Sequence, residues 1–176
     1  MPADRVYNVL FLCTGNSARS ILGEALLNLD GGKRFRGFSA GSHPKGKVSP
    51  MTLKVLADAE IATDGLRSKS WDEFAVTGAP QMDFVFTVCD NAAGETCPLW
   101  PGHPITAHWG IEDPAAVAGT ELQRRAAFED ALRFMRNRIG AFINLPLASI
   151  DRMTLTAKLQ GIGGMHGTSR HAPQVA

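Results

Sequence analysis

Two short apolar runs limit the folds that this chain can adopt. Residues 6–12 and 82–89 are nearly continuous runs of large or β-branched apolar side chains, with lengths typical of strands. Strands that are apolar on both faces are expected in a parallel sheet covered on both sides. A cysteine stands at the carboxyl end of each run, Cys13 after the first and Cys89 at the end of the second.

Segments with helical spacing alternate with the strands. Apolar side chains recur at helical intervals over residues 21–29, where Ser20 can cap the helix and Gly31 can end it. The remaining patterns predict a strand at 36–40, a helix from Ser49-Pro50 to about Ala59, a short strand at 105–108, and an amphipathic helix at 121–144 whose apolar stripe includes Leu122, Ala126 and Phe128. This order predicts an α/β fold, a three-layer α/β/α sandwich around a central, mainly parallel four-stranded sheet.

Length and charge restrict the function classes. A chain of 176 residues suits one domain, so we expect a single catalytic domain over residues 1–160 and a flexible, Gly-rich tail over 161–176. A formal net charge of +1 gives no support for a nucleic-acid or membrane surface, and we expect a monomer. The N-terminal residues lack a signal-like segment, and no apolar stretch reaches the roughly 20 residues that span a bilayer. We therefore expect a cytoplasmic protein with reduced thiols.

The segment after the first strand has the composition of an oxyanion-binding loop. It begins at Cys13 and reads Cys-Thr-Gly-Asn-Ser-Ala-Arg-Ser, with Arg19 six positions after the thiol. A loop that enters a helix N-terminus points several N–H groups at one place, and a guanidinium can hold two oxygens at once. Gly15 and Asn16 are expected to supply unusual backbone angles, and the positive field to lower the Cys13 pKa. The predicted oxyanion-binding residues are Thr14, Gly15, Asn16, Ser17, Ala18, Arg19 and Ser20. The structural alternative is that Cys13 is only a small buried apolar residue.

The loop is part of a wider resemblance. Together with Ser39-Ala40-Gly41-Ser42 and the later Asp113-Pro114, it resembles the low-molecular-weight protein tyrosine phosphatase family, over residues from about 8 to 145. The resemblance implies the fold of that family, and it implies that Asp113 is the general acid that protonates the leaving oxygen. On the residues alone, Asp113 before a proline is equally well explained as a turn residue.

Two further features resemble the arsenate reductases built on the same scaffold. Cys89 is followed by Cys97 across a polar segment that can move, and His108-Trp109-Gly110 comes just ahead of Asp113. The resemblance implies that Cys13 attacks arsenate, that Cys89 then attacks Cys13 and releases arsenite, and that Cys97 passes the disulfide on. It implies thioredoxin as the external reductant, or alternatively glutaredoxin with glutathione. The predicted catalytic residues are Cys13, Arg19, Cys89, Cys97 and Asp113.

Two other functions compete with arsenate reduction. A low-molecular-weight protein tyrosine phosphatase would use Cys13, Arg19 and Asp113 but would need no relay of thiols, and it would usually carry aromatic residues at positions 115 and 116, where this chain has alanines. Phosphatase activity can remain as a side reaction. A non-catalytic redox sensor acting through Cys89 and Cys97 would leave the complete anion loop unexplained.

The sequence indicates no tightly bound cofactor. Some members of the resembled family hold a potassium ion beside the loop, and oxygen ligands suit such a hard cation. The matching positions here are Asn16, Glu24, Ser39, Ser70 and Asp72. The alternative is that these side chains only support the loop by hydrogen bonds. The three cysteines and five histidines show no paired spacing typical of zinc sites.

Overall fold

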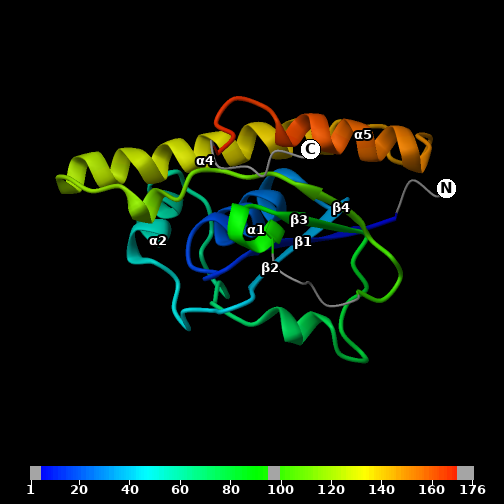
Figure 1. Ribbon diagram of the computed structural model, residues 1–176, viewed down its shortest axis with the longest axis horizontal. Coiled ribbons are helices and arrows are strands. Elements are labelled where there is room, and N and C mark those ends of the chain that lie inside the picture. The colour runs from blue at the N-terminus through cyan, green and yellow to red at the C-terminus, as the bar shows by residue number, and fades with distance from the viewer. Residues whose placement is uncertain (1–4, 95–99, 170–176) are drawn as a thin grey trace.

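A computed structural model describes residues 5–94 and 100–169 (Figure 1). The elements in chain order are β1 (Tyr7–Cys13), α1 (Arg19–Asp30), β2 (Phe35–Gly41), α2 (Pro50–Asp58), the 3-10 helix η1 (Trp71–Phe74), β3 (Phe84–Thr87), α3 (Asp90–Gly94), β4 (Ile105–His108), the 3-10 helix η2 (Pro114–Ala116), α4 (Glu121–Ile143) and α5 (Arg152–Gly163). Within these ranges, no helix combines the length and the apolar character needed to cross a membrane.

The four strands form one parallel sheet in the order β2-β1-β3-β4. The chain passes from β1 through α1 to β2 on one side, and later returns to β3 on the other side of β1. In open α/β sheets, ligands bind at such a reversal, outside the carboxyl ends of the strands. Cys13 is the last residue of β1 and Cys89 lies two residues after β3. The predicted sheet is thus confirmed, and both cysteines lie at the edge where sheets of this kind bind ligands.

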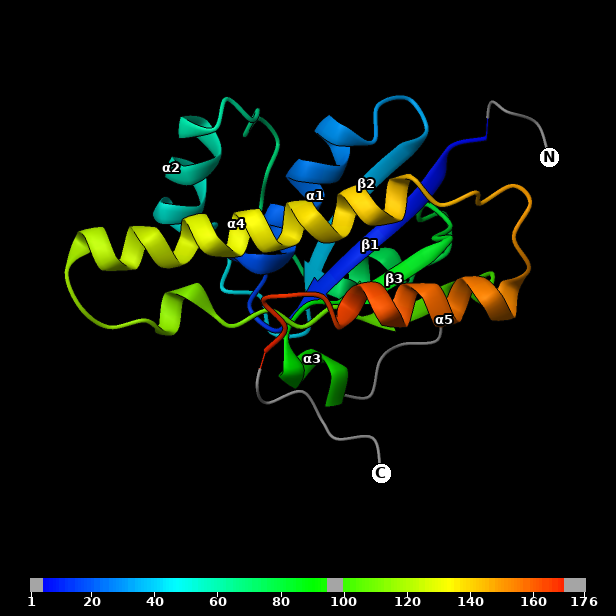
Figure 2. The ribbon, with the colours of Figure 1, turned by 90° about the horizontal axis from the view of Figure 1, so that it is seen from above.

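The two faces of the sheet are covered unequally. Helices α1, α4 and α5 cover one face (Figure 2). In the larger core on this face the Phe86 ring stacks on Trp109 with centroids 3.8 Å apart and meets Phe142 edge-on. On the other face Leu10 and Val85 pack with Phe74 of η1 in a smaller core. The three-layer α/β sandwich is confirmed, with a thin third layer built from η1 and its neighbouring segments.

Helix α4 is correctly placed, but its first turns are not buried. Thr120 caps the helix and forms a capping box with Gln123. Leu122, expected on the apolar stripe, is 77% exposed, and Ala126 is exposed as well. The start of α4 projects beyond the sheet (Figure 2). Burial therefore begins only at Phe128.

The C-terminal prediction needs correction over its described part. A tail was expected from Gly161, yet α5 runs on to Gly163, and Thr168 then forms a β-bridge with Ile111. The cause is Arg138, a fully buried residue of α4. Its guanidinium donates to the carbonyl oxygens of Met165 and His166 and to Thr168 Oγ1, at 3.0–3.2 Å. Residues 163–169 are therefore bound to the domain, and residues 170–176 lie outside the described range.

Candidate active site

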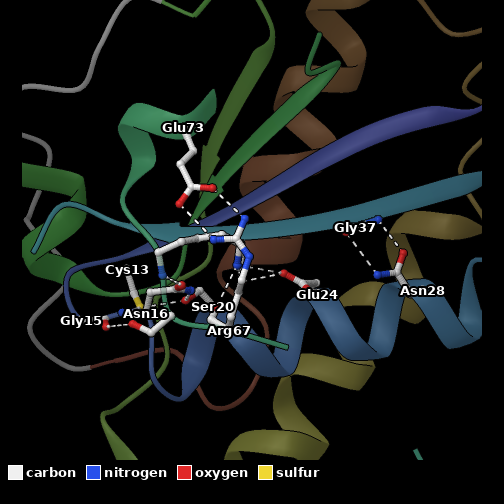
Figure 3. Close-up of polar contacts among 12 residues, drawn as sticks. Cys13, Gly15, Asn16, Ser20, Glu24, Asn28, Gly37, Arg67 and Glu73 are labelled. Carbon is white, nitrogen blue, oxygen red and sulfur yellow. Dashed lines mark hydrogen bonds and ion pairs between the residues drawn. The ribbon is translucent and has the colours of Figure 1, made fainter. Parts of the chain in front are cut away.

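The loop between β1 and α1 is closed by a buried asparagine. Asn16 alone among residues 13–19 has a left-handed backbone, with φ of 44°, and Gly15 does not share this conformation as we had expected. Asparagine tolerates that region better than most residues. The fully buried Asn16 side chain accepts from the Lys69 backbone N–H at 2.9 Å and donates to Ser20 Oγ at 2.8 Å (Figure 3). Asn16 thus ties the loop to the segment after α2.

Ser20 contacts the sulfur and does not cap the helix. The N-cap of α1 is Ala18, without a side-chain hydrogen bond. Ser20 Oγ lies 2.9 Å from Cys13 Sγ, and because it already accepts from Asn16, its own proton can be donated to the sulfur. The Asn16 backbone N–H also donates to Cys13 Sγ, at 3.2 Å. Both contacts favour the thiolate.

Burial nevertheless dominates the titration of Cys13. The residue is 4% exposed, and this desolvation raises the pKa of the Cys13 thiol, with Cys89 nearby adding to the rise. The hydrogen bonds from Ser20 and the charge of Arg19 lower the pKa by less. The predicted lowering is therefore wrong for this structure, because removal from water outweighs the positive field of the loop.

A cavity of about 200 Å³ lies over the loop, lined by residues 13–19 and by Asp113, Ala115 and Asn91. Arg19 Nη1 donates to the Ile111 carbonyl at 2.9 Å, and Nη2 lies 3.8 Å from the Asp113 carboxylate. Asp113 Oδ1 also accepts from the Ala115 N–H at 3.0 Å, as a turn residue does. The structure thus brings Cys13, Arg19 and Asp113 together around one cavity.

Two basic residues of the cavity were missed in the sequence. His43 and Lys45 line its rim, and their backbone N–H groups donate to the carbonyls of Thr14 and Gly15, both at 2.9 Å. The available signal was their position just after the second strand, at the same sheet edge as Cys13. Gly41 permits this close approach, since a Cβ at Gly41 would lie 2.4 Å from the Thr14 carbonyl oxygen.

Cys89 lies beside the loop at the start of α3. It is 2% exposed, and its Sγ is 3.6 Å from Thr14 Oγ1 and accepts from the Ala92 N–H at 3.4 Å. The expected mobile segment begins, over Asp90–Gly94, as a short helix. Both cysteines of the described residues are free thiols. Cys97 lies outside the described residues.

Two of the residues predicted to hold potassium, Glu24 and Ser39, lie beside an ammonium group. Lys69 Nζ lies 3.5 Å from Glu24 Oε1 and 3.4 Å from Ser39 Oγ, and Ser39 Oγ donates to Glu24 Oε1 at 2.7 Å. Lys69 Nζ also donates to the carbonyl of Arg67, whose guanidinium pairs with Glu73 (Figure 3).

This arrangement does not fit a potassium ion, because the Lys69 ammonium already supplies the positive charge beside Glu24. Burial lowers the pKa of Lys69. Of the other predicted ligands, Ser70 caps η1 by accepting from the Asp72 N–H, and Asp72 is exposed. Within residues 5–94 and 100–169, no cluster of three His, Cys, Asp or Glu residues could hold a metal ion.

Comparisons with known proteins agree with this fold. The family model for low molecular weight phosphotyrosine protein phosphatase matches residues 8–152. A protein of Oceanobacillus iheyensis named arsenate reductase is 34% identical over 134 residues, which are 76% of this chain and 93% of the relative.

Solved structures are similar over the same part of the chain. The arsenate reductase of Archaeoglobus fulgidus is 27% identical, with a TM-score of 0.56 over 75% of this chain and 98% of that chain. The thioredoxin-dependent arsenate reductase of Corynebacterium glutamicum has the same fold, at 24% identity and a TM-score of 0.54, over 79% of this chain and 64% of that protein. The family match over residues 8–152, the 34% identical relative and the parallel sheet lead to one conclusion: this chain belongs to the low molecular weight phosphotyrosine protein phosphatase family.

Proposed function

We propose that this protein is an arsenate reductase that works by a relay of thiols. The observation that carries the proposal is a second buried thiol, Cys89, beside the loop that begins at Cys13. Its sulfur lies 3.6 Å from the hydroxyl oxygen of Thr14 in that loop. A hydrolase of this family needs only one thiol, whereas a two-electron reduction oxidises two. The arsenate reductase of Oceanobacillus iheyensis, which this chain matches over 93% of its length, supports the same reaction.

In the first step Cys13 attacks arsenate held in the cavity. A sulfur–arsenic bond forms and one arsenic–oxygen bond breaks. The departing hydroxyl of arsenate takes a proton from Asp113 and leaves as water. The Cys13 thiol loses one proton in the same step, so the number of protons on the protein and the water together is unchanged once Asp113 is protonated again. Arg19 and the loop N–H groups would hold the remaining oxygens. Because burial raises the Cys13 pKa, the contact with Ser20 is needed to support the sulfur as it loses its proton.

In the second step Cys89 attacks the sulfur of Cys13. A disulfide forms between them, the sulfur–arsenic bond breaks, and its electron pair stays on arsenic. Arsenic(V) is thereby reduced to arsenic(III), and two thiols supply the two electrons. The proton of the Cys89 thiol leaves with arsenite, which departs from the cavity.

The third step regenerates Cys13. We propose that Cys97 attacks Cys89 and takes over the disulfide, which releases the Cys13 thiol. An external dithiol then reduces the pair Cys89–Cys97, and thioredoxin is our first choice, with glutaredoxin and glutathione as the alternative. The protein would act as a monomer in the cytosol, where thiols stay reduced.

A coupled assay tests the proposed function. Arsenate is supplied with thioredoxin, its reductase and NADPH, and separately with a glutaredoxin–glutathione system, and nucleotide oxidation is followed. We expect arsenate-dependent oxidation in at least one of the two systems. If neither shows it while the protein hydrolyses a phosphate ester, the chain is a phosphatase that uses Cys13, Arg19 and Asp113.

A further inference from the structure

The motif His108-Trp109-Gly110 joins three parts of the molecule that lie far apart in the sequence. The His108 ring contacts Asp90 of α3, and the Trp109 indole N–H donates to the Leu159 carbonyl of α5 at 3.0 Å. The Gly110 carbonyl accepts from the Ser169 N–H at 3.1 Å. The segment after α5 therefore runs beside α3 (Figure 2).

One carboxylate oxygen of Asp90 contacts both the His108 ring and the Ser169 side chain. Asp90 Oδ1 accepts from Ser169 Oγ at 2.7 Å and lies 2.9 Å from His108 Nε2. The other ring nitrogen, His108 Nδ1, lies 2.8 Å from Thr87 Oγ1, so the ring is held on both sides. The side chains of His108 and Asp90 are only 25% and 20% exposed, and Ser169 is buried. We call Asp90, His108 and Ser169 the clasp.

The clasp closes directly over Gly110. A Cβ at Gly110 would lie 2.6 Å from His108 Nε2, 2.7 Å from Ser169 Oγ and 2.9 Å from Asp90 Oδ1. Real Cβ atoms do not approach other atoms so closely, so a side chain here would push the three members apart. The glycine of the motif is thus explained by the clasp.

The clasp acts on the residue next to Cys89. Asp90 is the first residue of α3, a helix of five residues, which is too short to be stable by itself. Its position therefore depends on contacts with the rest of the domain, and Asp90 supplies the hydrogen bonds among them, beside the packing of the buried Ala92. The other end of the clasp is secured because Arg138 binds the segment that leads to Ser169.

We propose that Asp90, His108 and Ser169 are positioning residues that hold Cys89 where it can attack Cys13. The inference rests on the proposed function, because only the reductase reaction uses Cys89. Displacing a reacting group by about 1 Å costs on the order of 100-fold in rate. Loss of the clasp should therefore slow the second step and leave the first step intact.

The first test is a single turnover, in which arsenite is measured after one equivalent of arsenate is added to the reduced enzyme. We expect Asp90→Ala to form arsenite at least about tenfold more slowly, and Asp90→Asn to stay within about threefold of the natural protein. The amide keeps an oxygen that accepts from Ser169, so the conservative variant rescues the clasp. Hydrolysis of p-nitrophenyl phosphate, which needs no Cys89, should stay within about twofold in both variants.

The second test does not involve arsenate. In a background of Cys13→Ser and Cys97→Ser, the alkylation rate of Cys89 by iodoacetamide reports how well α3 covers the thiol. Adding Asp90→Ala should raise this rate about tenfold, because the thiol of Cys89, a residue only 2% exposed, becomes accessible. The matched control is Asp130→Ala on the exposed face of α4, where Asp130 pairs with Arg133, and it should leave the rate unchanged.

The outcomes separate this inference from the proposed function. If Cys89→Ser reduces arsenate at the natural rate, the proposed function fails. If Cys89→Ser is inactive but Asp90→Ala keeps natural rates in both tests, only the clasp is refuted. A loss of ester hydrolysis in Asp90→Ala equal to its loss of arsenite formation would also refute it, because the effect would not be specific to Cys89.

Discussion

The two cysteines at the edge of the sheet are held in different ways. Cys13 ends a central strand and enters a loop fixed from below by Asn16 and Ser20, both fully buried. Cys89 is just as buried, but it stands before a five-residue helix that side chains near the surface keep in place. The proposed relay explains the difference, because Cys13 must stay in the anion loop while Cys89 must bond first to Cys13 and then to Cys97.

The largest expected effect separates the roles of the two thiols. Cys89→Ser should reduce arsenate turnover to the background level, because no sulfur remains to displace arsenite, while ester hydrolysis continues within about twofold. Cys13→Ser should abolish both reactions. Arsenate-dependent NADPH oxidation and p-nitrophenyl phosphate hydrolysis measure the two activities. Equal loss of both activities in a folded Cys89→Ser protein would remove the distinction between the two regions.

The next prediction concerns the rigid region. Asn16→Ala removes the acceptor of the Lys69 N–H and the amide that donates to Ser20, and alanine tolerates the left-handed conformation less well than asparagine, so the free energy of unfolding should fall by about 2–4 kcal/mol. Ser169→Ala in the clasp should cost about 1 kcal/mol. Urea unfolding checks both values. Asn16→Gly serves as the control, since it relieves the backbone strain and isolates the lost hydrogen bonds. Equal costs for Asn16→Ala and Ser169→Ala would contradict the comparison.

A smaller effect on stability is expected from the ammonium group of Lys69 beside Glu24. The natural protein should have the same stability and ester hydrolysis rate in potassium and sodium chloride, because Lys69 already compensates Glu24. Lys69→Ala leaves the carboxylate unpaired and should lose about 2 kcal/mol of stability, part of which potassium restores. Thermal unfolding in the two salts measures this. A potassium requirement in the natural protein would show that the ammonium does not replace the ion.

The smallest effect is the pH dependence of Cys13. Its pKa is raised in the folded state, so the stability that the protonated thiol contributes is present below the ordinary value of 9.0 and is lost as pH rises through the folded pKa. The free energy of unfolding should therefore fall more steeply between pH 9.0 and the folded pKa in the reduced natural protein than in Cys13→Ser, by at most about 1.4 kcal/mol per pH unit. Urea unfolding at several alkaline pH values measures the slopes. Parallel slopes would mean that burial does not raise the pKa.

Local patterns in the sequence were enough to predict the sheet and the loop between β1 and α1. The strands ending near Cys13 and Cys89 are apolar runs followed by polar residues, and the Cys-to-Arg spacing lies within one loop and one helix start. Such features depend on residues that are close together in the sequence, so a short stretch of sequence is enough to recognise them.

Contacts between distant residues could not be predicted in this way. Ser20 resembles a cap in sequence, and only the folded loop places its hydroxyl on the sulfur. The Cys13 pKa depends on burial, which outweighs the charge pattern that a sequence displays. The contact of Asp90 with Ser169 spans 79 positions, and the buried Arg138 that anchors the C-terminal segment stands among exposed arginines of α4. Neither has a local signal.

The most direct test traps the intermediate disulfide. Cys97→Ser protein is reduced, mixed with one equivalent of arsenate, quenched with an alkylating agent and mapped by peptide mass spectrometry. We expect one arsenite per protein molecule and a disulfide between Cys13 and Cys89. Recovery of both thiols in alkylated form with the arsenate unchanged would contradict the relay that the two regions are built to serve.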